Sequence, residues 1–479
     1  MRHLVVYIVC VLAFIGCREY QVSDDPSLRL AFSADTICFD TLFTEQGSAT
    51  AQLVVYNPNK NALVVDKIWM EDGEAFRANI DGEPALERLK ELTIFGKDSI
   101  LVFLRVTDFG PMAEEGAILI EDRLHFHLAT GATQDVVLEA YAENATRLGQ
   151  IGSRTEIASD YTFTALKPYI LFDTILIGGK MTMEAGARLY MHQGASLVAL
   201  GDVEAKGEKD KPVLIRPDRL DHLFDSVPYL YAAGGWNGFY LQSDQPQTYE
   251  IHYLEVLSGN VGMSCVSTCT GTLPTLRMDG CKIHNHTLYG LVLEHVDALV
   301  TNTEISNCGL YCVYCNGGKQ DFVHSTVASY FGYTNIRIQS AKKENTAAVY
   351  IDNLSKTGEP TVTSFYNSVI TGYLSNQLVL ATPIEQYYEG VFSHNYLKTD
   401  TLLASSAKDN TYWQETDTAV FRNTFYKYKE YIYYDFRPDS LSPLRGIGDS
   451  IVALPYPMDR EGFSRELIRP DAGCYQYHP

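Results

Sequence analysis

Short apolar runs separated by Gly, Pro, Asn or Asp dominate the first part of the chain after its N-terminal segment. Between residues 28 and 145 they include 36–39, 51–56, 101–104, 124–128 and 136–140. Turn-forming residues such as those at 57–61 stand between them. Short strands with frequent turns favour a β-sandwich over a parallel sheet covered by helices. We therefore expect a β-sandwich over residues 28–145.

A repeat of 22 residues appears further along. Ile283, Ile305 and Val327 are each 22 positions apart, and a second series at the same spacing is Tyr289, Tyr311 and Tyr333. A fixed period in the low twenties without helix signals is typical of a solenoid made of short strands. Weaker copies at 366–369 and 394–397 extend the series. The pattern predicts a parallel β-helix over residues 150–479, with insertions leaving it as loops.

Several segments resemble the right-handed parallel β-helix family with the pectate-lyase-like fold. The opening coils are represented by 175–178, 183–190 and 201–207, and the closing coil by 439–446 and 469–475. Cys474 stands where such endings usually carry Ala. In the preceding region, Tyr56-Asn57-Pro58-Asn59 followed by Leu63-Val64-Val65 resembles immunoglobulin-like modules. The resemblances imply an all-β chain: an immunoglobulin-like β-sandwich followed by a right-handed parallel β-helix.

The N-terminus has the pattern of an export signal. A short basic start at Arg2 precedes an apolar stretch from Leu4 to Ile15, which is too short to span a bilayer as a helix. Phe14-Ile15-Gly16-Cys17 resembles a bacterial lipobox, although Phe14 departs from the usual Leu. The resemblance implies a signal peptide over 1–16 and lipidation of Cys17; the alternative is an ordinary secretory signal.

Residues 17–27 would then form a tether. Its acidic segment, Ser23-Asp24-Asp25-Pro26, resembles the surface-export signal of some Gram-negative lipoproteins. Together with the lipobox, it implies a protein anchored by lipid in the outer membrane and facing the cell surface. Several acyl chains give stable anchoring, so the outer membrane is an expected partner.

The amino-acid composition excludes some classes of partner and of structure. The chain has 38 Lys and Arg against 59 Asp and Glu, a formal net charge of −21, which argues against nucleic acid because phosphate binding depends on clustered cations. An apolar fraction of 46% excludes disorder throughout. The 32 Tyr and 21 Phe, against 3 Trp, favour strands.

Metal and cofactor signals are weak. Cys308, Cys312 and Cys315 have the spacing that radical-SAM enzymes use for an iron–sulfur cluster, but small apolar fillers of strands explain them better. Cys265 and Cys269, or Cys281 with a neighbour, could form disulfides in an oxidising compartment. We expect no metal and no cofactor.

Two histidine pairs could likewise be either metal ligands or ordinary polar residues. His125 and His127 would lie on one face of a strand, and His284 and His286 flank a turn-forming Asn. Neither pair has a third ligand in view. A polar strand face and a solvated turn are therefore the preferred interpretations.

Catalysis is not favoured. Residues one period apart become neighbours on adjacent coils, which places Lys282 beside Glu304 and Asp279 beside Thr301. A lyase of this fold needs carboxylates on adjacent coils for calcium, and no such ladder appears. The adjacent aspartates and Gly-His-Gly of galacturonases are also missing from the β-helix region.

A charged insertion between two coils is the candidate binding site. It contains Asp218, Arg219, Asp221 and Asp225 and is followed by Trp236. One interpretation is a ledge for a sugar or peptide, with Trp236 stacking; the other is a covering loop with Trp236 packed as an anchor. We expect a non-catalytic binding or scaffolding protein for a glycan or envelope protein. The alternative is a polysaccharide lyase or glycoside hydrolase.

Overall fold

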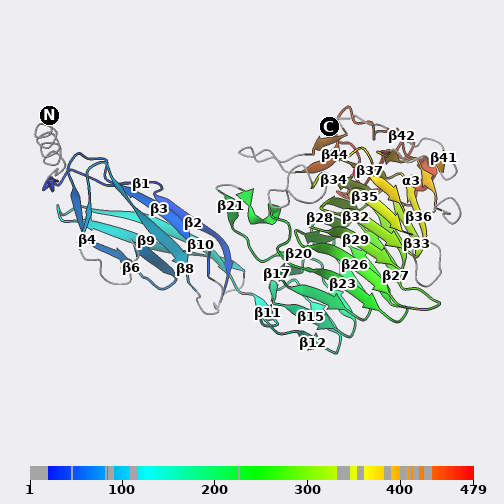
Figure 1. Cartoon of the computed structure of the whole chain (residues 1–479), viewed down its shortest axis with the longest axis horizontal. Coiled ribbons are helices and arrows are strands. Elements are labelled where there is room, and N and C mark those ends of the chain that lie inside the picture. Colours follow the sequence, from blue (N-terminus) through cyan, green and yellow to red (C-terminus); the bar gives the residue numbers. More distant parts are fainter. Residues whose placement is uncertain are drawn as a thin grey trace, which may run out of the picture. The chain divides into compact units, whose positions relative to one another are not determined.

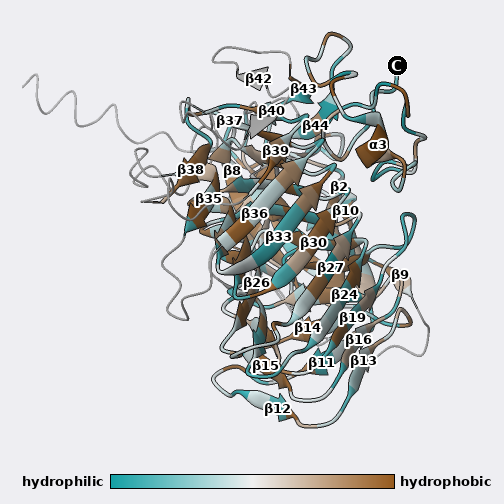
Figure 2. Ribbon diagram, turned by 90° about the vertical axis from the view of Figure 1, so that its right-hand side faces the viewer, coloured by the Kyte–Doolittle hydropathy of each residue, from teal (hydrophilic) through white to brown (hydrophobic). Residues whose placement is uncertain are grey.

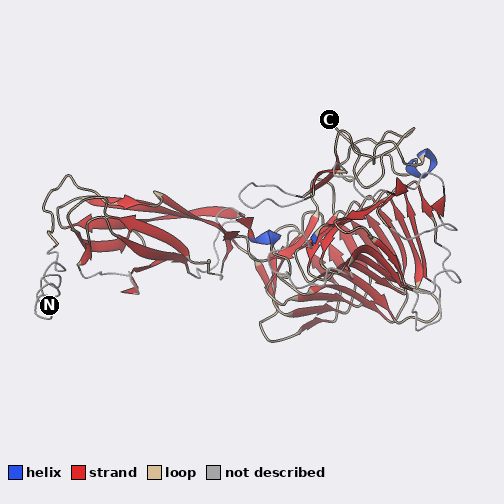
Figure 3. Cartoon of the chain, turned by 45° about the horizontal axis from the view of Figure 1, so that its top comes forward, coloured by secondary structure: helices blue, strands red, loops and turns tan. Residues whose placement is uncertain are grey.

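The computed structural model describes residues 20–44, 47–80, 83–84, 91–107, 116–224, 227–331, 346–352, 361–381, 390–399, 407–408, 412–413, 420–424 and 434–479. The chain divides into two compact units, 1–144 and 145–479. Strands and loops make up nearly all of the described chain (Figure 3). None of its helices is long and apolar enough to cross a membrane.

The first unit is a β-sandwich of two five-stranded sheets. One sheet has the order β1 (Ala31–Phe32), β3 (Ala51–Tyr56), β8 (Ser99–Val106), β5 (Phe76–Ile80), β6 (Glu83–Pro84). The other has the order β2 (Thr36–Phe43), β10 (Thr133–Glu143), β9 (Ala117–Leu128), β4 (Leu63–Met70), β7 (Leu92–Ile94). All neighbouring strands are antiparallel except β2 and β10.

Alternation along the strands builds the core of this sandwich. In β8, Val102 and Leu104 are buried while Phe103 between them is exposed, as a period of two requires. The turn after β3 is held by Asn57, whose side-chain amide donates to the carbonyls of Asn61 and Ile94, each at 2.9 Å. The Asn-rich turn of the sequence is thus fixed by a buried amide.

The second unit is a right-handed parallel β-helix (Figure 1). Each full coil gives one strand to each of three parallel sheets. The 11-stranded sheet contains β11 (Thr146–Leu148), β14 (Tyr169–Leu171), β17 (Arg188–Met191), β20 (Val213–Pro217), β25 (Leu254–Leu257), β28 (Lys282–His286), β31 (Glu304–Cys308), β34 (Thr326–Ser329), β37 (Val369–Gly372), β40 (Tyr396–Leu397) and β42 (Tyr412–Trp413).

The other two sheets follow the same stacking. The nine-stranded sheet contains β12 (Thr155–Ile157), β15 (Thr174–Ile177), β18 (Ser196–Ala199), β23 (Gly238–Ser243), β26 (Val261–Ser267), β29 (Tyr289–Glu294), β32 (Tyr311–Asn316), β35 (Ala347–Asp352) and β38 (Leu378–Leu380). The 10-stranded sheet contains β13 (Tyr161–Phe163), β16 (Met181–Met183), β19 (Val203–Lys206), β24 (Thr248–His252), β27 (Thr275–Asp279), β30 (Asp297–Thr301), β33 (Gly318–Val323), β36 (Thr361–Tyr366), β39 (Phe392–Ser393) and β41 (Ala407–Lys408). Figure 2 shows strands of this last sheet side by side, with hydrophobic and hydrophilic residues mixed along them.

Outside the coils, the described residues form two short hairpins and two short helices. The elements are β21 (His222–Phe224), β22 (Val227–Pro228), the 3-10 helix η1 (Tyr229–Tyr231), β43 (Phe421–Asn423), β44 (Asp435–Pro438) and α3 (Ser450–Ala453). The first three belong to the charged insertion between β20 and β23. The segment from β44 to the C-terminus packs against earlier coils, because Asn367 accepts from the Asp449 amide at 2.7 Å and donates to the Asp449 carbonyl at 2.9 Å.

The predicted 22-residue register is confirmed. Ile283 pairs with Ile305, and Ile305 with Val327, all inside the β-helix. Tyr289 pairs with Tyr311, but Ala347 occupies the next place in that ladder. Tyr333, expected there, lies outside the described residues. The insertion after β34 breaks the period, so sequence spacing alone assigns the wrong partner.

One corner of the coil explains the recurring Gly and Asn. The residues between the 10-stranded and 11-stranded sheets have positive φ on successive coils: Gly280, Asn302, His324, Asn367 and His394. Gly and Asn tolerate this conformation best. The next residue turns a small polar side chain inward, where it bonds across coils; Ser325 N, for example, donates to Ser368 Oγ at 3.0 Å.

Candidate functional site

The charged insertion satisfies most of its own polar groups. Asp218 Oδ2 lies 2.7 Å from His192 Nδ1, and this hydrogen bond raises the pKa of His192 against the opposing effect of burial. Arg219 Nε donates to Asp221 Oδ1 at 2.7 Å, and the Arg219 guanidinium lies 4.2 Å above the Tyr229 ring. Asp225 lies outside the described residues. The described charges therefore hold the insertion together.

Trp236 is a core residue. Its side chain is 0% exposed, and its indole nitrogen donates to the Leu257 carbonyl at 2.9 Å. Gly259 packs directly on the ring, since a Cβ there would lie 2.9 Å from the indole. Of the two interpretations offered for Trp236, the structure agrees with the anchor, because no ring face is left open for stacking on a ligand.

A different surface gathers aromatic side chains. Leu291 and Val313 point into the core of the β-helix, so Tyr314, which follows Val313, points outward by alternation. Tyr289 and Tyr311 begin β29 and β32, where they stay partly exposed. Four half-buried tyrosines on three successive strands contact one another; we call them the tyrosine array: Tyr289 on β29, Tyr311 and Tyr314 on β32, and Tyr350 on β35.

Ring geometry makes the tyrosine array continuous. The Tyr311 and Tyr350 rings are stacked with centroids 4.6 Å apart, and Tyr314 and Tyr350 at 5.9 Å. Tyr289 joins through a tilted contact of 6.0 Å with Tyr311. Tyr289 with Tyr311, and Tyr314 with Tyr350, are register partners on adjacent strands, which lie roughly 4.8 Å apart, so their side chains meet across the ladder. The repeat of the fold therefore sets the repeat of the aromatic surface.

Polar groups border the tyrosine array on one side. The outward row next to it carries Glu294, Asn316 and Asp352, which pair in that order across β29, β32 and β35. The Tyr314 hydroxyl donates to Asp352 Oδ2 at 3.1 Å. Burial, and then the Asp352 charge, raises the pKa of Tyr314. Its hydroxyl therefore remains a protonated donor at neutral pH.

The hydroxyls of the other three tyrosines in the array are also protonated at neutral pH. Burial is the largest cause raising the pKa of Tyr289, Tyr311 and Tyr350. The tyrosine array thus presents uncharged rings and neutral hydroxyls beside a row of carboxylate and amide groups. Such a surface suits a ligand with alternating apolar and hydroxyl-bearing faces.

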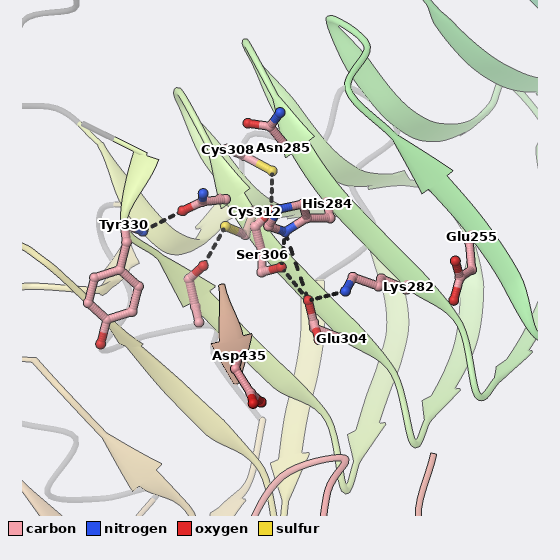
Figure 4. Close-up of polar contacts among 12 residues, drawn as sticks. Glu255, Lys282, His284, Asn285, Glu304, Ser306, Cys308, Cys312, Tyr330 and Asp435 are labelled. Atoms are coloured by element: carbon pink, nitrogen blue, oxygen red, sulfur yellow. Dashed lines mark hydrogen bonds and ion pairs between the residues drawn. The ribbon is translucent and has the colours of Figure 1, made fainter. Parts of the chain in front are cut away.

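A second cluster lies on the outer face of the 11-stranded sheet (Figure 4). Glu304 Oε1 accepts from the Ser306 hydroxyl at 2.7 Å and lies 3.6 Å from Lys282 Nζ. His284 Nδ1 lies 2.8 Å from Ser306 Oγ and 3.9 Å from Glu304 Oε1. Serine, histidine and a carboxylate therefore meet at one point.

This second cluster does not have the geometry of a catalytic triad. Ser306 and Glu304 approach the same nitrogen of His284, whereas a relay needs one partner on each ring nitrogen. Burial, and then the Lys282 charge, lowers the pKa of His284 to about 3, so the imidazole is neutral. Glu304 is 1% exposed. Glu304 and Ser306 are thus buried members of a polar contact whose other members, Lys282 and His284, are partly exposed.

The C-terminal segment covers that second cluster. The Tyr475 hydroxyl donates to Glu304 Oε2, and Arg460 Nη2 lies 2.6 Å from Glu255 Oε1. Burial raises the pKa of Glu304, but Lys282, His284 and Arg460 outweigh it and hold that pKa at about 2. Glu304 is therefore ionised and serves to dock the end of the chain.

The described residues contain no group of three or more His, Cys, Asp or Glu arranged to hold a metal. His127 Nδ1 lies 2.6 Å from Asp66 Oδ1, and His125 stacks on Trp69 at 4.8 Å. His284 and His286, expected in a solvated turn, lie in β28, where His286 is buried. All eight described cysteines are free, so the structure pairs none of those considered for disulfides.

Comparisons with known proteins reach only part of the chain. No protein-family model and no curated protein matches it. Similar solved structures include a PapD-like domain of human CEP192 (10% identity, 27% of this chain, 96% of that chain, TM-score 0.18). Another is the periplasmic chaperone SfaE (15% identity, 24% of this chain, 57% of that chain, TM-score 0.18). A third is a family 123 glycoside hydrolase from Clostridium perfringens (7% identity, 28% of this chain, 31% of that chain, TM-score 0.18).

Proposed function

We propose that this protein is a non-catalytic, lipid-anchored glycan-binding protein of the outer membrane. Cys17 would carry the lipid, and the β-helix would present the tyrosine array to an extracellular glycan. The observation that carries the proposal is the run of four contacting, half-buried tyrosines on β29, β32 and β35.

The chemistry of the tyrosine array favours a glycan over other ligands. Sugars offer C–H faces to aromatic rings and hydroxyls to polar groups, and both kinds of partner occur here within two adjacent rows. The rings of Tyr289 and Tyr311, and of Tyr314 and Tyr350, stand on adjacent coils with centroids 6.0 and 5.9 Å apart, so successive sugars of a chain would meet similar surroundings. With Glu294 and Asp352 beside the rings and a net charge of −21, the favoured ligand is a neutral glycan.

A glycan panel with cleavage scored in the same samples tests this proposal. The purified protein from residue 18 onward is incubated with neutral and acidic polysaccharides, and both binding and new reducing or unsaturated ends are measured. We expect binding to a neutral glycan without new ends. Tyr311→Ala should weaken it by at least roughly tenfold, or ~1.4 kcal/mol.

Tyr141→Ala is the matched control, because Tyr141 is an exposed tyrosine on β10 of the sandwich. Binding that Tyr141→Ala weakens as much as Tyr311→Ala would contradict the proposed surface. New chain ends would instead favour the lyase or hydrolase alternative. If no glycan binds, a protein partner becomes the better explanation. In cells, Cys17→Ser should release the protein from the membrane fraction, and protease shaving should degrade the wild type on intact cells.

A further inference from the structure

The C-terminal segment that closes the β-helix contains a cavity of about 680 Å³. This is a typical size for a small-molecule site. Three arginines line it, Arg445, Arg465 and Arg469, together with hydroxyl-bearing side chains such as Ser442 and Ser464. In a chain with a net charge of −21, this cavity carries more arginines than acids, since Glu466 and Asp471 are the acids in its lining.

Arg465 is the unusual member of this set. It is 4% exposed, and only its Nη2 has a partner, Asn302 Oδ1 at 2.7 Å. Within the described chain, its Nε and Nη1 make no hydrogen bond. Burial is the largest cause lowering its pKa, to about 10, so the guanidinium remains charged at neutral pH. An unpartnered buried charge is costly, which makes a ligand for these nitrogens the natural explanation.

Arg445 and Arg469 are exposed. The Arg445 guanidinium lies 4.0 Å above the Tyr477 ring and donates to the Ser440 carbonyl. Arg469 packs against Gly446, where a Cβ would lie 3.4 Å from Arg469 Nε. In the described part of the molecule, none of the three arginines makes an ion pair with a carboxylate.

Two acids line this cavity, Glu466 and Asp471, and backbone amides already occupy both oxygens of Asp471. Asp471 Oδ1 accepts from the Gly446 amide at 2.8 Å, and Oδ2 accepts from the Tyr477 amide at 2.7 Å. Asp471 therefore holds the wall of the cavity together. The guanidinium groups keep donors for a ligand, and their planar forks match carboxylate, phosphate and sulfate oxygens.

We propose that this cavity binds an oxyanion group, with Arg465 at its buried side and Arg445 and Arg469 at its exposed side. The group is a carboxylate, phosphate or sulfate, either free or at the end of a larger molecule. This site is separate from the tyrosine array and does not rest on the function proposed for it.

Isothermal titration calorimetry of the full protein from residue 18 onward, at low ionic strength, tests the site. The probes are inorganic phosphate, sodium sulfate and glucuronate, with glucose as the neutral control. Binding of phosphate or sulfate supports a free oxyanion, and binding of glucuronate alone supports an acidic sugar. No binding of any of the three overturns the proposal, as does equal binding of glucose.

Variants locate the binding. Arg445→Gln with Arg469→Gln should weaken it at least tenfold, while Arg154→Gln, on an exposed arginine paired with Glu156, should leave it unchanged. Arg465→Met should abolish binding and raise the thermal midpoint of the unliganded protein, because the unpartnered charge is removed. If Arg465→Met does not fold, the double variant decides. Unchanged binding in the double variant overturns the site.

Discussion

Two outer faces of the same β-helix differ in how far their side chains are buried. The outward side chains of β28 and β31 in the 11-stranded sheet are mainly polar, yet Glu304 and Ser306 are buried under the C-terminal segment. The tyrosines of β29, β32 and β35 in the nine-stranded sheet are largely apolar, yet they remain half-exposed. Polarity alone would have suggested the reverse.

What differs is the presence of complementary partners. Glu304 becomes buried because Lys282, Ser306 and Tyr475 satisfy its oxygens, which is the condition for burying a charge. The tyrosine array has a hydroxyl at each ring tip and tolerates water there. One face therefore serves the closure of the fold, and the other keeps its groups available for a ligand.

Removal of the Glu304 carboxylate should have the largest effect on the stability of the fold. Glu304→Ala leaves the buried Tyr475 hydroxyl without its acceptor, removes one of the two partners of Ser306, and leaves the Lys282 charge without its carboxylate, so we expect a loss of about 3 kcal/mol or more in the free energy of unfolding. Urea unfolding followed by near-ultraviolet signals measures the loss. Glu184→Ala, on an exposed turn before β17, is the control. Equal losses in the two variants would show that the covered face adds nothing to stability.

The same face should make the β-helix sensitive to acid. His284 has a pKa of about 3 in the folded protein and His286 of about 4, both mainly because of burial, against 6.5 unfolded. The unfolded chain therefore binds more protons below pH 6.5, and stability falls as pH falls from 6.5 towards 4.5. Glu304, with its pKa held at about 2, loses its contribution only below 4.5.

His284→Gln isolates one of these histidines. Each buried histidine gives a slope of about 1.4 kcal/mol per pH unit in this window, so the variant should lose roughly that amount of slope. His252→Gln, on an exposed histidine of β24, should retain the wild-type slope. Unfolding midpoints between pH 6.5 and 4.5 measure both. A variant slope equal to that of the wild type would mean that His284 is accessible to protons in the fold.

The sequence was sufficient where backbone repetition decides the outcome. Lys282 lies beside Glu304, and Asp279 beside Thr301, as a 22-residue coil requires. It was insufficient where a distant segment packs on the coils: nothing in the period places Arg460 and Tyr475 against β25 and β31. Burial of the second cluster was therefore not predictable from spacing.

The tyrosine array and the charged insertion show the same limit of prediction from sequence. Tyr289 and Tyr311 were found as repeat markers, but Tyr314 and Tyr350 pair across an insertion that breaks the period. The sequence left Trp236 either as part of a binding ledge or as an anchor in the core, and its indole packs in the core and donates to the Leu257 carbonyl. Local composition identified the insertion without showing which side chains turn inward.

The smallest effect on stability should come from the tyrosine array itself. Tyr350→Ala removes ring contacts to Tyr311 and Tyr314 but leaves no buried charge behind, so we expect a loss of about 1 kcal/mol. Tyr350→Phe keeps the rings and should lose less. Thermal unfolding of both variants beside Glu304→Ala ranks the two faces. A loss in Tyr350→Ala as large as that in Glu304→Ala would show that the array is part of the structural core, and the contrast between a closing face and a binding face would fail.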